Sequence, residues 1–372
     1  MQRFVRIAVA SLTLSSAAIL FDGCGTGELP TAVEQPQQLF AHHIAAAEKP
    51  VLDGIGNDAV WANASSYRVF IDPNTGGVNV PSSGLLMEFK AVWWEETRID
   101  STTSDTLEVP YIGFLATWPD PESNIDKHKW SYNASNSTWV QGPGKSDWLI
   151  MIWLSAAEGT DIWYWDAATT NPMGYFQDML LEYYNNVNEL IPLFVRVDGL
   201  SFFNDTESSQ NTWDNNYDDN KTPRDSTDDR PLMAWKNDPN VTTPALPPVY
   251  SDAAENMSLL LESDAAALAQ TVFSSPTSAA SVPGYVLQQP LGGSADIPCY
   301  GRHSNGKWTL EFYRSAGGSD NYDVVFNPRA RYFSQVFTVG LGYNVPSPFD
   351  VDGESLTTDN SVQLTFQFVL EE

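Results

Sequence analysis

The chain has 372 residues, of which 42% are hydrophobic, so it is long enough for one large domain or two ordinary ones with a buried core. Its 47 acidic residues outnumber the 19 basic ones and give a formal net charge of −28. Nucleic acid and anionic lipid both need a basic protein surface, so this charge argues against either as an electrostatic partner. Solubility is the simplest explanation of so acidic a composition.

The N-terminus has the features of an export signal. Two arginines precede an apolar run over residues 7–21, which has the length of a signal-peptide core and is too short for a comfortable transmembrane helix. The run ends in Phe-Asp-Gly-Cys, which resembles a bacterial lipoprotein box. We therefore expect residues 1–23 to be a lipoprotein signal peptide, Cys24 to carry the lipid, and residues 24–48 to be a tether in an exported, periplasmic or outer-membrane-attached protein. Ordinary signal-peptidase cleavage nearby is the alternative.

Cysteine usage excludes several cofactors. Once Cys24 is lipidated, Cys299 is the second and last cysteine, so no internal disulfide can form. The chain has no Cys-x-x-Cys-His motif for covalent c-type haem, and two cysteines cannot build a cysteine-based zinc or iron–sulfur site. We expect Cys299 to be a small buried hydrophobic residue.

Short strand patterns dominate the chain after the tether. The adjacent His42 and His43 have no nearby partners to complete a metal-ligand set, so we expect them in the linker or in the lead-in to a strand. A short helical turn is predicted at Asp58–Trp61. The polar residues 95–108 suit a long hairpin loop. Strands are predicted over Leu85–Trp94, Tyr111–Trp118, Trp148–Leu154 and Asp161–Trp165.

The region over about residues 201–256 differs from the rest, because it is rich in aspartate and has no hydrophobic periodicity. Its aspartates could bind calcium, but their spacing does not match an EF-hand loop, and a solvated acidic insertion is the preferred interpretation. A helix is predicted over Met257–Leu268 from its alanines and acidic residues. The predicted strands resume over Lys307–Arg314, Tyr322–Phe326, Tyr332–Val339 and Val362–Leu370. This pattern predicts a mainly β fold, an antiparallel β-sandwich over residues 49–372 with one insertion.

The stretch Thr160–Met179, TDIWYWDAATTNPMGYFQDM, carries most of the chemical information. Its alternation predicts a strand with aromatic side chains on both faces. Such aromatic residues beside a methionine suit either the wall of a flat apolar ligand site or the core of a sandwich. Asp161 and Asp178 could form a carboxylate pair across the turn, but hydrogen bonding to the backbone of the Asn171–Gly174 turn is the preferred interpretation.

Four sequence blocks together resemble a known family. They are PVLDGIGNDAVWANA (Pro50–Ala64), LATWPDPESN (Leu115–Asn124), the Trp-x-Trp…Asn-Pro…Gly…Asp stretch just described, and NGKWTLEFYR with DVVF (Asn305–Arg314 and Asp323–Phe326). In this order they resemble the haem-binding domain shared by the haem subunit of ethylbenzene dehydrogenase, related gamma subunits of the type II DMSO-reductase family, and a group of cytochrome c-552 proteins. The first block alone is also similar to the opening of family 9 carbohydrate-binding modules.

The resemblance implies a β-sandwich that holds a non-covalent b-type haem in an exported electron-transfer protein, with a redox partner or a molybdenum-enzyme complex. It also implies axial methionine and lysine ligands, but the corresponding positions here, residues 155–159 and about Asn360, contain neither residue type. Met173, on a turn beside the aromatic residues, has the best chemical setting for a replacement ligand. The expected haem-contacting residues are Trp163, Tyr164, Trp165, Met173 and Phe176, and the candidate axial ligands are Met173, Met151 and His303.

Two functions therefore follow from the sequence. Haem-based electron transfer is the first. The alternative is a carbohydrate-binding β-sandwich lipoprotein that has lost haem, in which tryptophan and tyrosine rings stack on sugars. We do not expect an enzyme, because the chain has no nucleophile elbow, phosphate-binding loop or His-x-x-x-His pattern.

Overall fold

A computed structural model describes thirteen segments of the chain. They are residues 38–74, 77–99, 102–154, 160–186, 189–197, 213–217, 229–235, 260–267, 281–288, 296–318, 323–330, 333–346 and 361–366. The predicted signal peptide, Cys24 and most of the predicted tether and acidic insertion lie outside these segments. None of the helices within them is both long and apolar enough to cross a membrane.

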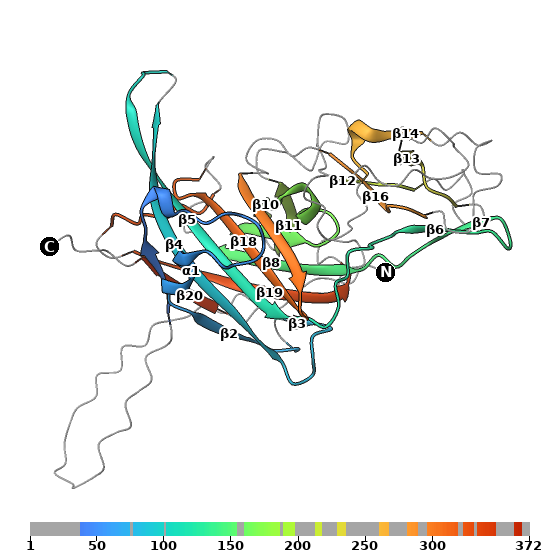
Figure 1. Ribbon diagram of the computed structural model, residues 1–372, viewed down its shortest axis with the longest axis horizontal. Coiled ribbons are helices and arrows are strands. Elements are labelled where there is room, and N and C mark those ends of the chain that lie inside the picture. The colour runs from blue at the N-terminus through green and yellow to red at the C-terminus, as the bar shows by residue number, and fades with distance from the viewer. Residues whose placement is uncertain are drawn as a thin grey trace, which may run out of the picture.

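One closed sheet forms the body of the described structure (Figure 1). Its ten strands are β1 (Leu39–His43), β20 (Ser361–Phe366), β19 (Ser334–Val345), β8 (Ser146–Leu154), β9 (Thr160–Asp166), β10 (Tyr175–Asn186), β17 (Ile297–Ser304), β18 (Lys307–Ser315), β5 (Thr106–Pro119) and β4 (Leu85–Ile99), in that spatial order. The ring closes because β4 pairs with β1. Neighbouring strands are antiparallel except at β1, which runs parallel to both β20 and β4.

Shorter elements extend this sheet or lie beside it. Three strands add to it at single neighbours: β2 (Tyr67–Ile71) on β4, β3 (Gly77–Val78) on β19, and β11 (Glu189–Val197) on β10. Small sheets lie to one side (Figure 1), formed by β6 (Trp130–Asn133), β7 (Thr138–Gln141) and β15 (Ser281–Val282), by β12 (Trp213–Asn215) and β16 (Tyr285–Leu287), and by β13 (Met233–Trp235) and β14 (Ala265–Ala267). The helical elements are α1 (Ala59–Asn63) and the 3-10 turns η1 (Ala46–Glu48), η2 (Asn171–Met173) and η3 (Glu262–Asp264).

The period of two in the strands explains where the core lies. Along β9, Trp163 and Trp165 belong to the main aromatic core, whereas Ile162 and Tyr164 belong to a separate cluster on the other face. Successive side chains of a strand point to opposite faces, so the aromatic pattern of this segment fills both. Burying each large apolar side chain contributes about 1.5–3 kcal/mol, and the main core contains many of them.

The prediction of a mainly β fold is confirmed, but the arrangement differs from the expected sandwich. The strands join into one closed sheet, whereas a sandwich has two sheets facing each other. Closure depends on β1, whose residues pair with Leu364 of β20 and with Ala91 of β4. These contacts link the first and last described strands, and no local sequence pattern encodes them.

The predicted hairpin loop over residues 95–108 is shorter in the structure. Strands β4 and β5 continue through most of it, with Arg98 paired to Leu107. The resulting hairpin projects beyond the closed sheet (Figure 1). A two-stranded ribbon with both faces in solvent tolerates polar side chains, so polarity alone does not indicate a loop.

Two other predictions are wrong within the described residues. The helix expected over Met257–Leu268 is replaced at residues 262–267 by η3 and β14, which pairs with β13. The strand expected over Tyr322–Phe326 is absent at residues 323–326. There the backbone N–H of Val324 donates to the side chain of Asp161 instead of to a neighbouring strand.

Candidate functional site

The aromatic residues predicted to contact haem are buried on two faces of the sheet. Trp163, Trp165 and Phe176 have no exposed surface and lie in the main core, and Cys299 is buried with them as expected. Tyr164 is 1% exposed and faces the other side. The structure therefore brings three of the predicted residues together and separates Tyr164 from them.

The rings in the main core are in direct contact. Trp163 lies 4.7 Å from Trp153 between ring centroids, Trp165 lies 5.0 Å from Trp308, and Phe176 lies 4.5 Å from Phe312. These separations are those of packed aromatic pairs. A porphyrin does not fit between these rings as they are arranged. That they contact haem stays a prediction, one that needs a different arrangement of these rings.

The three candidate iron ligands lie in different environments. Met151 has no exposed surface and pairs with Trp163 across β8 and β9 inside the main core. Met173 is half-buried and packs against the cluster of Tyr285 and Leu287. His303 is half-buried, with Nε2 2.9 Å from the carbonyl oxygen of Asp120. Among these three, Met173 and His303 are the ones at the edge of packed regions.

Asn171 joins the predicted turn to strand β17. Its Oδ1 accepts hydrogen bonds from Trp165 Nε1 at 3.1 Å and from the backbone N–H of Gly301 at 2.8 Å. Its Nδ2 donates to the carbonyl oxygen of Gly301 at 3.0 Å. The asparagine of the Asn-Pro block is therefore a structural clamp between segments far apart in sequence.

The turn between β9 and η2 is capped by Asp166, which corrects the role expected for Asp161 and Asp178. Asp166 Oδ1 accepts hydrogen bonds from the backbone N–H groups of Ala168 at 2.8 Å and Thr169 at 3.1 Å. Asp161 and Asp178 instead point into a buried cluster. An aspartate at the first residue of a turn is well placed to bond to backbone two residues later, and Asp166 has that position.

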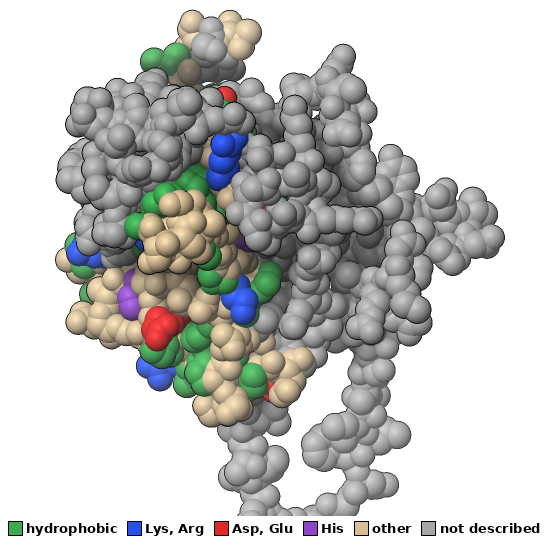
Figure 2. Space-filling model, turned by 90° about the vertical axis from the view of Figure 1, so that its right-hand side faces the viewer, with side chains coloured by type: hydrophobic (Ala, Val, Ile, Leu, Met, Phe, Trp, Pro, Cys, Tyr) green, Lys and Arg blue, Asp and Glu red, His purple; other side chains and the backbone are tan. Residues whose placement is uncertain are grey.

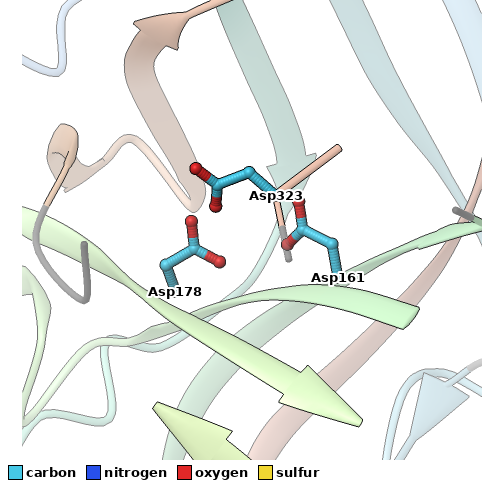
Figure 3. Close-up of side chains that lie close together, drawn as sticks. All are labelled: Asp161, Asp178 and Asp323. Atoms are coloured by element: carbon cyan, nitrogen blue, oxygen red, sulfur yellow. The ribbon is translucent and has the colours of Figure 1, made fainter. Parts of the chain in front are cut away.

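Asp161, Asp178 and Asp323 converge in that cluster, with carboxylate oxygens within 4.8 Å of one another (Figure 3). Arg314 NH1 lies 3.2 Å from Asp161 Oδ2 and 3.4 Å from Asp178 Oδ2. Arg314 NH2 lies 2.6 Å from Asp323 Oδ2 and 3.7 Å from Asp296 Oδ2. We call Asp161, Asp178, Asp296, Asp323 and Arg314 the aspartate–arginine cluster.

The aspartate–arginine cluster borders the aromatic core. Asp161 occupies the same face of β9 as Trp163, and the Arg314 guanidinium lies 5.2 Å from the Trp163 ring centroid. Burial raises the pKa of Asp161 to about 6, while Arg314 opposes that rise. Burial alone would lower the pKa of Arg314, but the surrounding carboxylates, led by Asp178, raise it above its usual value.

Sequence reasoning missed this cluster as a unit. Arg314 and Asp178 stand in the quoted blocks, yet nothing in their spacing shows that they meet. The inward face of β9 did carry a signal. Asp161 stands two positions before Trp163 and four before Trp165, so it shares the face of these two core tryptophans and is buried with them. A buried carboxylate needs a partner, and the nearest arginine at an inward position of a predicted strand is Arg314.

A second buried polar group surrounds Asp166. Its Oδ2 accepts hydrogen bonds from Ser146 Oγ at 2.7 Å and from Tyr164 OH at 2.8 Å. Lys127 Nζ lies 3.5 Å from the same oxygen and 5.7 Å from the ring centroid of Tyr285. Tyr164, predicted to contact haem, thus serves here as a hydrogen-bond donor beside a buried ion pair.

A solvent-open groove of about 570 Å³ lies between β1, η1, α1 and β4. Ile44 and Val51 contribute apolar surface to it, and His42 and Asp58 contribute polar groups. His42 Nε2 lies 2.8 Å from Ser65 Oγ. The histidine pair lies inside β1, within the range predicted as tether, so it is neither linker nor the lead-in to a strand. The groove has the size and mixed lining of small-molecule sites.

The surface offers little support for sugar stacking. All eleven tryptophans whose side chains are described are at most 8% exposed; they are Trp61, Trp93, Trp94, Trp118, Trp130, Trp139, Trp148, Trp153, Trp163, Trp165 and Trp308. On the face shown in Figure 2, acidic, basic and hydrophobic side chains are interspersed over the described residues. Stacking of sugars on tryptophan therefore has no exposed tryptophan among these residues to support it, whereas Tyr217, which is 41% exposed, is an accessible tyrosine ring of the kind that the carbohydrate alternative needs.

Comparison with known proteins finds a family match over the middle of the chain and most of its C-terminal part. A family model described as ethylbenzene dehydrogenase matches residues 150–336, which is half of the chain. The match includes the Trp163–Trp165 stretch, Asn171 and Arg314, and so covers the third and fourth sequence blocks. The comparison with curated proteins gives no match.

Proposed function

The chain belongs to the ethylbenzene dehydrogenase family, and from this premise we propose that it is an exported electron-transfer protein that binds haem b without a covalent link. The family match over residues 150–336 is the observation that carries the proposal. Lipidation at Cys24 and docking to a redox partner or a molybdenum-enzyme complex are parts of the same proposal. The net charge of −28 suits a partner that presents a basic surface.

We propose the groove beside β1 as the haem-binding site. Its volume of about 570 Å³ lies within the range of roughly 300–1,000 Å³ for cofactor and ligand sites. Ile44 and Val51 offer an apolar contact surface, and His42 offers an imidazole, which is a common axial ligand of haem iron. The packed core around Trp163 offers no such space. Bound haem would supply one-electron redox chemistry.

The residues of the groove fit a ligand role for His42. Its Nε2 is within hydrogen-bond distance of Ser65 Oγ, at 2.8 Å. A second group that holds one ring nitrogen fixes the tautomer and orientation of a ligating histidine. Asp58 and Glu48 at the groove place negative charge nearby, which favours the more positively charged oxidation state of a bound metal. Met173, which is half-buried and packs against Tyr285 and Leu287, does not line this groove, so a ligand role for Met173 would place the haem elsewhere.

Haem binding is tested by expressing the full chain with its export signal under haem supply, followed by absorbance spectroscopy and iron analysis. We expect a Soret band and about one iron per chain. His42→Ala should weaken the band or shift it, and His128→Asn is the matched control, because His128 does not line the groove and asparagine tolerates its φ of +55°. Loss of the Soret band in Met173→Leu, with the band kept in His42→Ala, would show that Met173 is the iron ligand. A purified protein with no Soret band and no iron would refute the proposed function.

A further inference from the structure

The aspartate–arginine cluster holds more negative than positive charge. Asp161, Asp178 and Asp323 have fully buried side chains, and Asp296 is 17% exposed. Arg314, also fully buried, contributes one positive charge against these four carboxylates. Like charges buried together cannot all ionise without a counter-charge, so the site requires protons or a further cation.

One buried carboxylate oxygen shows where a cation is needed. Asp161 Oδ2 accepts the Arg314 guanidinium at 3.2 Å and the backbone N–H of Val324 at 2.7 Å. Asp161 Oδ1 accepts no hydrogen bond from an N–H group among the described residues, although the side chain has no exposed surface, and the Asp161 and Asp178 carboxyls are close enough to share a proton or a cation. Leaving a buried carboxylate oxygen without a partner is unfavourable, and a metal ion on this oxygen would satisfy it.

The geometry suits one ion. The carboxylate oxygens of Asp161, Asp178 and Asp323 lie within 4.8 Å of one another and come from three separate segments that converge (Figure 3). Calcium–oxygen distances are about 2.3–2.6 Å, so two oxygens on one calcium ion lie at most about 5 Å apart. Arg314 contacts Asp161, Asp178 and Asp323 through their Oδ2 atoms, and Asp161 Oδ1 is not among its contacts.

The all-oxygen ligand set favours a hard cation. Zinc and copper sites in proteins use histidine or cysteine, and magnesium usually keeps several waters and binds through only one or two carboxylates. Three buried carboxylates match the preference of calcium. We propose that Asp161, Asp178 and Asp323 bind one calcium ion, with Arg314 as the partial counter-charge. The ion would link β9 and β10 to the segment around Asp323. Its binding would not depend on haem.

The test uses the full exported chain, stripped with a chelator and returned to chelator-free buffer at physiological salt. We expect about one calcium per chain by mass spectrometry of bound metals, and a melting temperature that rises with calcium but not with equal magnesium. Asp161→Asn should abolish both effects. The matched control is Asp120→Asn, which changes another buried aspartate outside the cluster and should keep both.

Several outcomes would overturn the proposal. A stripped wild-type protein that neither binds calcium nor gains stability would show that the carboxylates share protons instead. Calcium binding that is equally strong in Asp161→Asn would place the ion elsewhere, for example in the acidic insertion. An equal response to magnesium would overturn the calcium assignment. If Asp161→Asn does not fold, the wild-type metal content and calcium-dependent melting still decide the question.

Discussion

Trp61 donates its indole N–H to Glu311 Oε1 at 2.8 Å and so ties the first sequence block to strand β18. Glu311 Oε2 accepts the backbone N–H groups of Gly54 at 2.9 Å and Asp53 at 3.3 Å. Gly54 has a φ of +68°, and a Cβ there would lie 2.6 Å from Arg302 Cβ, so glycine is required for this approach. The Asp-Gly…Trp and Gly-x-Trp-x-x-Glu blocks are therefore two halves of one buried contact.

Removing the Glu311 carboxylate should destabilise the fold strongly. Glu311→Ala leaves the donors of Trp61, Gly54 and Asp53 without their acceptor, and each buried unsatisfied donor costs about 1–3 kcal/mol. We expect the free energy of unfolding in urea to fall by roughly 3–5 kcal/mol. Glu311→Gln keeps one carbonyl acceptor and should lose clearly less. Equal losses in the two variants would show that the acceptor does not matter.

Stability should decrease as pH rises from about 4 to 7. Burial raises the pKa of Glu311 to about 7 and that of Asp120 to about 7, and Asp147 adds to the rise at Asp120. The unfolded chain loses these protons near pH 4, so their contribution to stability is complete below that pH and is lost as pH rises through about 7.

Calorimetry in the presence of a chelator checks this pH dependence without interference from metal ions. The melting temperature should be higher at pH 5 than at pH 8, and Asp120→Asn and Glu311→Gln should each flatten the profile. A surface substitution, Glu88→Gln, is the control, because Glu88 forms a solvent-exposed ion pair and no buried contact. A profile that rises steadily from pH 5 to 8 would contradict the prediction.

The sequence predicted the strands and their faces wherever alternation was unbroken. In β18, Trp308, Leu310 and Phe312 share one face and all lie in the main core, as a period of two requires. The sequence could not predict how the sheet closes, because Leu39 of β1 pairs with Leu364 of β20, which is far away in the sequence. Alanine-rich residues 265–267 form a strand because β13 offers a partner, and local propensity does not contain that information.

The candidate site was only partly predictable for a related reason. The quoted blocks contain Asn171, Glu311 and Arg314, but a residue's identity does not show whether it binds a cofactor or clamps two segments. The contact of Asp161 with Arg314 spans 153 positions and depends on the order of four strands. Trp163, Trp165 and Phe176 lie together while Tyr164 lies on the other face, and the packing that decides between a core and a pocket became visible only with all the strands in place.

The buried pair of Lys127 and Asp166 should be coupled. Both side chains are at most 4% exposed and their charged atoms are 3.5 Å apart, so Lys127→Met leaves a buried carboxylate without its cation. Breaking such a pair from one side costs about 3–5 kcal/mol. Asp166→Asn in the same chain should recover part of that loss, which a double-mutant cycle in urea measures.

The control for that cycle is the exposed pair of Arg68 and Glu88, 3.3 Å apart with side chains 64% and 32% exposed. Water screens an exposed pair, so its coupling should be below about 1 kcal/mol. A coupling for Lys127 and Asp166 that is no larger than the control would mean that the 3.5 Å contact contributes nothing beyond a surface ion pair.

The Asn171 clamp should contribute to stability through its amide as a whole. Asn171→Ala removes the acceptor of Trp165 Nε1 and of the Gly301 N–H and the donor to the Gly301 carbonyl, all of them buried. We expect a loss of roughly 3 kcal/mol or more in the free energy of unfolding. Asn171→Asp keeps the acceptor but turns the donor to Gly301 into a buried charge, so it should be no better than alanine.

Trp165→Phe separates the two parts of the clamp. Phenylalanine removes the indole N–H but leaves both bonds between Asn171 and Gly301, so its loss should come mainly from the smaller ring in the core, about 1–3 kcal/mol. Combining it with Asn171→Ala should then cost less than the sum of the two single losses, because the Trp165 bond is counted in both. Strict additivity would show that Asn171 acts through Gly301 alone.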